Sequence, residues 1–223
     1  MQWRKVREQG AVMRNGLLAG LVLTLVSFIS PAQDGTADFA NETKKIADVL
    51  ELGPGMMVAD VGAGDGRYSV FLSGQVGASG RIYATEIDQE KVDAINKSVA
   101  GKSNVTVLLG KQDSTGLPDQ CCDRILLRRV YHHLHQQGPM LKSLLDSLKP
   151  GGVLAIVDFL PRQDLTNPDG TPDDHEHGTS VEKLIEQVTG HGFELVRRVE
   201  GWPSRVVDGK ETDYCVLFRR PAR

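Results

Sequence analysis

The sequence predicts an α/β protein: one doubly wound, mostly parallel seven-stranded sheet with an antiparallel last strand. Nearly continuous apolar runs of strand length alternate along the chain with segments whose apolar residues recur at helical spacing. Helices between successive strands imply right-handed crossovers, and these give a parallel sheet covered on both faces. The last two apolar runs have no helix between them, so the final strand is expected to run antiparallel.

The first half of the domain is expected to supply three helices and three strands. The predicted helices, from apolar residues at helical spacing, lie within residues 39–52, 67–76 and 88–100. The predicted strands, from short apolar runs, span residues 57–61, 81–87 and 104–110. Asp88 stands where the third helix begins, and its short acidic side chain is expected to cap that helix.

The second half is expected to continue the pattern and then to add the antiparallel strand. The predicted strands span residues 123–129, 151–159, 193–201 and 212–220. The predicted helices lie within residues 135–149 and 179–192, the second capped by Thr179 or Ser180. Residues 160–178 are rich in Pro, Asp and Gly and lack periodicity, which predicts a long loop over the strand ends.

The first 32 residues have the layout of an export signal. Four basic residues precede the uncharged apolar run 16–29, and the small residues of "SPA" follow it, with cleavage expected after Ala32. The run is shorter than the roughly 20 residues that span a bilayer comfortably, which favours a cleaved signal over a membrane anchor. We expect a signal peptide or anchor over residues 1–32, a domain over 33–223, and a periplasmic, secreted or membrane-anchored location. A start at Met13 would leave Arg14 as the only basic residue before the run.

Composition and cysteine content exclude several classes of protein. The chain has 223 residues, 40% of them hydrophobic and 25% charged, as in an ordinary globular domain. Its formal net charge of -3 offers no broad basic surface, so a nucleic-acid partner is not expected. Three cysteines cannot all pair within one chain, and the adjacent Cys121 and Cys122 could pair only through a strained ring. No Cys/His spacing of a structural zinc site is present, so no metal site is expected.

A glycine-rich turn, "VADVGAGDGRYS" over residues 58–69, follows the first predicted strand. In doubly wound sheets ligands bind beside this strand, outside the carboxyl ends of the strands. The spacing of Gly62, Gly64 and Gly66 differs from the dinucleotide fingerprint G-x-G-x-x-G. Asp60 precedes the turn, where a carboxylate disfavours a pyrophosphate but can bind a ligand with an ammonium group. A tight bend without a ligand is the alternative for the glycines.

Residues 58–69 resemble motif I of the class I S-adenosylmethionine-dependent methyltransferases, and later stretches match that family in order. The likeness covers residues 39–220 and implies the Rossmann-like methyltransferase fold with S-adenosylmethionine as cofactor. The family's cofactor-binding positions correspond here to Asp60, Gly62, Gly64, Gly66, Glu86 and Asp113. In the family, the acid at the position that matches Glu86 accepts hydrogen bonds from both ribose hydroxyls. The acid at the position that matches Asp113 contacts the adenine amino group. "LKPGG" over residues 148–152 and the terminal strand "DYCVLF" also fit.

The resemblance places the acceptor at the end of the fourth strand, where "RRVYHHLH" occupies residues 128–135. Methyl transfer is an in-line displacement that needs an aligned acceptor and, for a protonated acceptor, a base. Tyr131, His132 and His133 are the catalytic candidates, although at least one histidine is expected only to pack or cap. The Asn/Asp-Pro-Pro-Tyr pattern of amino-group and adenine methyltransferases is absent from this position in the sequence, which argues against those acceptors.

Other polar residues are secondary candidates for the acceptor pocket. They are Asp158 at the end of the fifth strand, and His175, Glu176 and His177 in the long loop. A solvated acidic loop is the favoured interpretation of "DDHEH", rather than a metal site. Arg128 and Arg129 are expected either to contact an acidic acceptor or to pair with neighbouring carboxylates.

The expected function is transfer of a methyl group from S-adenosylmethionine to a small-molecule or lipid-like acceptor. A membrane association through the N-terminal segment accompanies this expectation. The alternatives are an exported protein that binds S-adenosylmethionine without turnover, and a nucleotide-dependent oxidoreductase with an atypical glycine turn.

Overall fold

The computed structural model describes residues 35–161, 178–203, 206–207 and 210–222. The predicted export signal, residues 1–32, lies outside these ranges and stays a prediction. Across the described ranges, no helix combines the length and apolar character needed to cross a bilayer.

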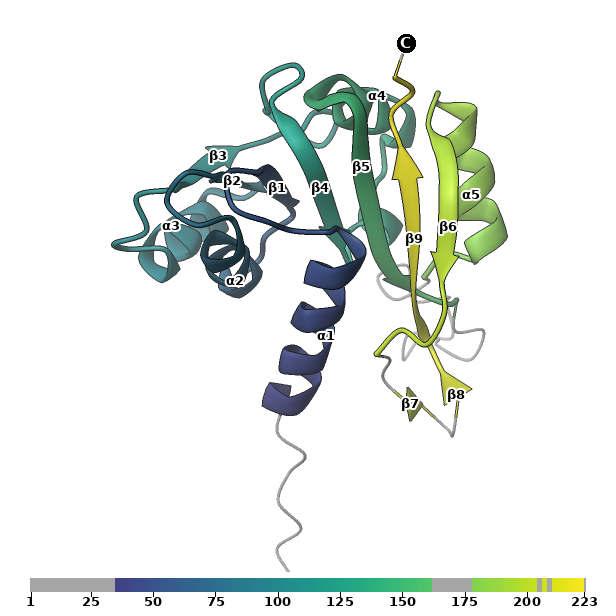
Figure 1. Ribbon diagram of the computed structural model, residues 1–223. Coiled ribbons are helices and arrows are strands. Elements are labelled where there is room, and N and C mark those ends of the chain that lie inside the picture. Colours follow the sequence, from purple (N-terminus) through teal and green to yellow (C-terminus); the bar gives the residue numbers. More distant parts are fainter. Residues whose placement is uncertain (1–34, 162–177, 204–205, 208–209, 223) are drawn as a thin grey trace, which may run out of the picture. The chain divides into compact units, whose positions relative to one another are not determined.

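The described residues form a seven-stranded sheet in the order β3-β2-β1-β4-β5-β9-β6 (Figure 1). Its strands are β1 (Met57–Val61), β2 (Arg81–Glu86), β3 (Val105–Leu109), β4 (Cys122–Arg128), β5 (Leu148–Phe159), β6 (Glu194–Val199) and β9 (Asp213–Arg219). β1 to β5 pair in parallel, whereas β9 runs antiparallel to both of its neighbours, β5 and β6. The predicted fold class is therefore confirmed.

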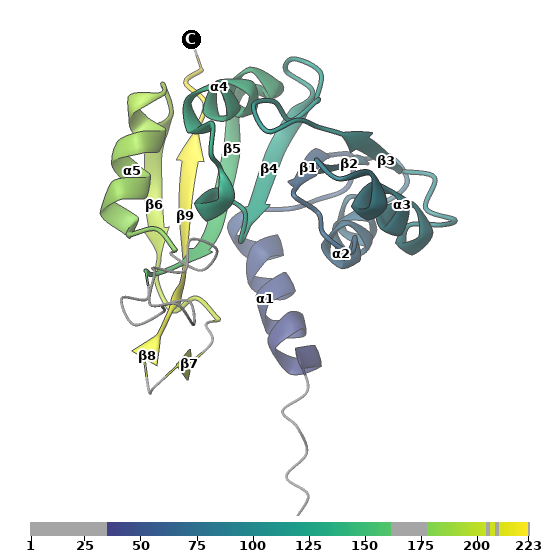
Figure 2. The same ribbon diagram turned by 180° about the vertical axis from the view of Figure 1, so that it is seen from behind.

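Helices cover both faces of the sheet. They are α1 (Gly35–Val49), α2 (Arg67–Val76), α3 (Gln89–Ser98), α4 (Gln137–Ser147) and α5 (Val181–Gly190). Successive residues of a strand face opposite sides: in β5, Ile156 packs in the core under α4 and α5, while Val157 packs in the core under α1 and α2. The view from behind shows α4 and α5 together on one face (Figure 2). Both faces of the central strands are thus buried, which explains why their sequences are nearly all apolar.

Two caps formed as the sequence predicted. The side chain of Asp88 accepts hydrogen bonds from the backbone N–H groups of Glu90 and Lys91 at the start of α3. Ser180, rather than Thr179, caps α5 by accepting from the N–H of Lys183.

The structure corrects the boundary between α4 and β5. The predicted helix was expected to reach residue 149, but it ends at Ser147, and β5 begins at Leu148. Leu148 is fully buried and pairs with Cys122 of β4, so its burial favours extended backbone. Pro150 also disfavours helical backbone at the residue before it. A small hairpin of β7 (Val206–Val207) and β8 (Lys210–Glu211) between β6 and β9 was not predicted.

The strand order creates a crevice at one edge of the sheet. β1 pairs with β2 on one side and with β4 on the other, so the crossovers leave β1 in opposite directions. Ligands of doubly wound sheets bind at this switch point, outside the carboxyl ends of the strands. Val61 is level with Thr85 and Leu127, which brings the residues that follow β1, β2 and β4 to the same edge.

Candidate cofactor and acceptor site

The glycine turn after β1 is fixed against β2. The N–H groups of Gly62 and Ala63 both donate to the carbonyl oxygen of Thr85, at 2.9 and 3.0 Å. Gly62 has φ 74°, and a Cβ atom there would overlap the side chain of Val130, so both its backbone and its surroundings require glycine. Gly64 has φ 60° and open space on the side where a Cβ would point. The backbone at Gly64 is therefore accessible to a ligand.

A cavity of about 910 Å³ opens beside this turn. Its volume lies near the upper end of the roughly 300–1,000 Å³ typical of small-molecule sites. Of the predicted site residues, those that line it are Asp60, Gly62, Gly64, Glu86 and His133. Gly66 is not among the described lining residues, since it is the N-cap of α2, and its missing side chain leaves space for α3.

Asp60 is a buried carboxylate on the cavity wall. Its Oδ2 accepts a hydrogen bond from Ser69 Oγ at 2.6 Å. Burial raises the pKa of Asp60 from its ordinary 3.8 to about 6, although the hydrogen bond from Ser69 acts in the opposite direction. A cationic ligand group next to Asp60 would favour its charged form, so the site is electrostatically suited to an ammonium group.

Glu86, at the end of β2, is held in place by backbone groups. Its Oε1 accepts from the N–H of Gly64 at 3.0 Å, and its Oε2 accepts from the N–H of Ile87 at 3.1 Å. Lys91 Nζ lies 3.8 Å from Oε1. A carboxylate offers about four lone-pair positions, so each oxygen keeps capacity for a further donor. This geometry suits a pair of neighbouring hydroxyl groups, such as those of a ribose.

Asp113 lies at the exposed tip of a tight turn. The backbone groups of Lys111 and Ser114 hydrogen-bond to each other in both directions across this turn. Gln112 and Ser114 line the cavity, whereas Asp113 is not among the described lining residues. The role implied for Asp113 toward adenine stays a prediction.

The three candidates after β4 point in different directions. They form the short 3-10 helix η1 (Tyr131–His133). Tyr131 is fully buried and donates its hydroxyl to Gln187 Oε1 of α5 at 2.9 Å. His132 is also buried, whereas His133 is exposed and lines the cavity. The tight turn directs the side chains of Tyr131 and His132 into the protein, and neither is among the described residues that line the cavity, so a catalytic role for them stays a prediction.

His132 and Asp158 form a buried pair beneath His133. His132 Nδ1 lies 2.8 Å from Asp158 Oδ1, and Asp158 also accepts from the N–H groups of His132 and Phe159. The ring of His133 lies against that of His132, with the ring centres 3.9 Å apart and the ring planes tilted by 46°. Asp158 was a secondary candidate for the acceptor pocket. Its hydrogen bonds with His132 instead hold the η1 turn in place.

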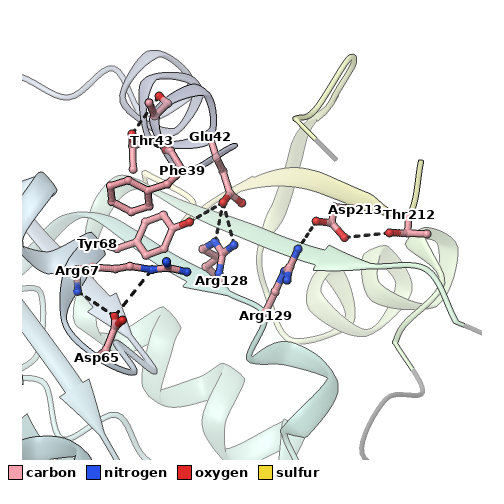
Figure 3. Close-up of polar contacts among 11 residues, drawn as sticks. Phe39, Glu42, Thr43, Asp65, Arg67, Tyr68, Arg128, Arg129, Thr212 and Asp213 are labelled. Carbon is pink, nitrogen blue, oxygen red and sulfur yellow. Dashed lines mark hydrogen bonds and ion pairs between the residues drawn. The ribbon is translucent and has the colours of Figure 1, made fainter. Parts of the chain in front are cut away.

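A cluster of charged and aromatic side chains forms another part of the cavity wall (Figure 3). Glu42 of α1 accepts, through Oε2, from the hydroxyl of Tyr68 at 2.5 Å and from Arg128 at 2.8 and 3.0 Å. The Arg128 guanidinium also lies 4.5 Å from the centre of the Tyr68 ring. Tyr68 and Arg128 line the cavity, and Glu42 holds them from behind. The sequence interpretation missed Glu42 and Tyr68.

Arg129 directly follows Arg128, the last residue of β4. Its backbone is left-handed, with φ 55°, and its guanidinium pairs with the carboxylate of Asp213 at the start of β9 (Figure 3). Arg128 and Arg129 both pair with carboxylates of the chain, which was one of the two expectations for them. Both also line the cavity, so the other expectation, contact with an acidic acceptor, stays a prediction.

The remaining secondary candidates, His175, Glu176 and His177, lie outside the described residues. Within the described part of the chain, no group of three or more His, Cys, Asp or Glu side chains could hold a metal ion.

Comparison with known proteins agrees with this geometry. The family described as "Methyltransferase domain" matches residues 59–156. A protein-L-isoaspartate O-methyltransferase of Methanosarcina mazei is 34% identical over 114 residues, which are 50% of this chain and 44% of that protein. The same-named protein of Aeropyrum pernix is 29% identical, over 71% of this chain and 61% of its own. The chain thus matches less than two thirds of either relative. A solved SAM-dependent methyltransferase from Aquifex aeolicus superposes with a TM-score of 0.65 and 25% identity, covering 83% of this chain and 98% of that one.

Proposed function

The chain belongs to the class I S-adenosylmethionine-dependent methyltransferases, and from this premise we propose that it methylates a small-molecule or lipid-like acceptor. One observation carries the proposal. A single cavity is lined by Asp60 near the end of β1, by the glycine turn that follows it, by Glu86 at the end of β2 and by a histidine after β4.

The residues present fit the cofactor that the family implies. Asp60 offers a carboxylate for an ammonium group, and Glu86 keeps acceptor capacity for two hydroxyls. The open backbone at Gly64 also lines the cavity, next to Glu86, to which its N–H donates. S-adenosylmethionine, when bound, supplies a methyl group on a positively charged sulfur. These three residues would hold it by its amino acid and ribose parts.

The acceptor side must align a nucleophile and exclude water. Val130, Leu134 and Met140 give this side apolar surface, and Arg128 and Tyr68 give it hydrogen-bonding groups. For a hydroxyl acceptor, His133 would take the proton as the new bond to carbon forms, since an imidazole serves as a base near neutral pH. For a carbon or thiolate acceptor, His133 would only position the acceptor.

The size of the cavity supports a small acceptor. A volume of about 910 Å³ accommodates a cofactor together with a small molecule or one end of a lipid. A folded macromolecule could present only a protruding side chain or base to such a site.

The N-terminal sequence supports a location outside the cytoplasm or at a membrane. Basic residues, an uncharged apolar run and "SPA" follow one another over residues 1–32. Mass spectrometry of the native protein is expected to find Gln33 as its first residue. An intact N-terminus on a protein in the cytoplasmic fraction would refute export, and one in the membrane fraction would support the anchor.

Transfer of a labelled methyl group tests the proposal. The purified protein is incubated with methyl-labelled S-adenosylmethionine and an extract of its own cells, and the labelled product is identified. We expect a labelled small molecule or lipid with the wild type and little label with Glu86→Ala. Bound cofactor without any labelled product would support the non-catalytic alternative. Failure to bind S-adenosylmethionine, together with binding of a nicotinamide nucleotide, would support the oxidoreductase.

A further inference from the structure

Two consecutive cysteines at the start of β4 bring their sulfur atoms together. Cys121 Sγ lies 3.0 Å from Cys122 Sγ. Successive side chains of an extended strand point to opposite faces, so this approach requires irregular backbone. Such backbone is present on both sides. Gln120 has a left-handed conformation, with φ 49°, and the pairing of β4 with β5 changes register between Cys122 and Arg124.

The two thiols have different surroundings. Cys122 is fully buried in the core under α4 and α5, whereas Cys121 is partly exposed. The hydrogen bond with Cys122 lowers the pKa of the Cys121 thiol, and the Lys149 ammonium adds to this effect. The same hydrogen bond, followed by burial, raises the pKa of Cys122. Cys121 is therefore the accessible sulfur that ionises first, and Cys122 is its buried neighbour.

This pair is separate from the cofactor and acceptor cavity. It lies at the amino end of β4, whereas the cavity lies beyond the carboxyl ends of the strands. The third cysteine, Cys215, is buried in the core on the other face of the sheet, and burial raises the pKa of its thiol. Cys215 is therefore an internal control for the reactivity of the pair.

We propose that Cys121 and Cys122 are a reversible redox site, which a low-molecular-weight disulfide oxidises to a vicinal disulfide. The Cys121 thiolate attacks one sulfur of the oxidant, forming a mixed disulfide and releasing one thiolate. Cys122 then loses its proton and attacks Cys121 Sγ, which displaces the second thiolate. Two electrons pass from the cysteine pair to the oxidant, whose two sulfurs leave as thiols.

The short distance favours the second step over any competing thiol. With the two sulfurs 3.0 Å apart, the attacking atom is already next to the mixed disulfide. The ring that forms is strained, and strained disulfides are readily reduced. Reversibility therefore follows from the same geometry that allows oxidation. The site does not depend on the proposed methyl transfer.

Oxidation of the folded, reduced protein by oxidised glutathione tests the proposal. We expect intact-mass spectrometry to show a loss of two hydrogen atoms, peptide mapping to place the link between Cys121 and Cys122, and dithiothreitol to reverse it. Cys215→Ser should give the same result, while Cys122→Ser should stop at a glutathione adduct on Cys121. Pretreatment with phenylarsine oxide, which bridges two neighbouring thiols, should block the oxidation.

Two results would overturn the proposal. One is a wild type that carries stable glutathione on Cys121 and never loses the two hydrogen atoms. The other is a loss of two hydrogen atoms in Cys121→Ser, which would assign the link to Cys122 and Cys215. Both results are measured on the wild type and on Cys121→Ser, which keep Cys122 in the core. A folding defect of Cys122→Ser therefore does not affect the test of the proposal.

Discussion

Lowering the pH from 7 to 5 is expected to weaken the binding of S-adenosylmethionine through one buried side chain, Asp60. Its carboxyl group has a pKa of about 6 in the empty site because burial disfavours the charged form. The ammonium group of the cofactor should favour the charged form and lower this pKa. Binding would then release a proton whenever Asp60 is protonated beforehand.

The size of the effect follows from these pKa values. At pH 5 only about a tenth of the empty protein carries a charged Asp60, so the affinity should fall about tenfold between pH 7 and pH 5. Above pH 7 the contribution of Asp60 should be constant. Two histidines, His133 and His135, also line the cavity. Only the pH dependence that Asp60→Asn removes is assigned to Asp60.

The same carboxyl group makes the stability of the empty protein pH-dependent. Its folded pKa of about 6 lies above its ordinary value of 3.8, so between these values the folded protein binds more protons than the unfolded chain. Stability should therefore fall as the pH rises from about 4 to about 6 and stay lower above that. At about 1.36 kcal/mol per pKa unit, the ionised group costs up to ~3 kcal/mol. Asp60→Asn should recover part of this at pH 7 and nothing below pH 4.

Calorimetric titrations and urea unfolding between pH 4 and pH 8, on the wild type and Asp60→Asn, measure both effects. We expect the affinity of the variant to be weaker at pH 7 and to lack the contribution of Asp60 at lower pH. Identical pH profiles of the two proteins would refute the reasoning. A wild-type affinity that rises as the pH falls would refute it as well.

Three further substitutions test the remaining parts of the site. His133→Asn should slow the methylation of a hydroxyl acceptor by about 100- to 10,000-fold while cofactor affinity stays unchanged, and a wild-type single-turnover rate would remove His133 as the base. Asp158→Ala should lower the free energy of unfolding by roughly 2–4 kcal/mol in urea, because donors of His132 and Phe159 lose their acceptor; wild-type stability would contradict that structural role. Gly62→Ala should weaken cofactor binding and stability together, since a Cβ atom there meets Val130, and a variant that matches the wild type in both would show that the turn adapts.

Much of the fold was predictable because the sequence of a buried parallel sheet has few alternatives. The apolar runs of β1, β2 and β4 predicted the ends of these strands to within one residue. Asp88 correctly predicted where α3 begins. The start of β5 was missed because its first residues pair across an irregular register. Such a register depends on the neighbouring strand rather than on any local pattern.

The candidate site was predictable where its residues sit at strand ends and missed where it depends on tertiary packing. Asp60 and Glu86 reach the cavity because parallel strands end at one edge. Tyr131 and His132 turn inward, since the direction of side chains in a three-residue 3-10 helix follows from packing. Glu42 lies 86 residues from Arg128 in the chain, so no local pattern could indicate their contact.

Calorimetric titration of S-adenosylmethionine into the wild type, Glu86→Ala and Glu90→Ala tests the central claim most directly. Glu90 is a matched control, because it is an exposed glutamate at the start of α3 and is not among the described residues that line the cavity. We expect binding to the wild type and to Glu90→Ala with equal affinity, and a loss of roughly 1.5–3 kcal/mol in Glu86→Ala, the range for hydrogen bonds to a charged group. No binding to the wild type, or equal affinity in all three proteins, would contradict the assignment of this cavity to the cofactor.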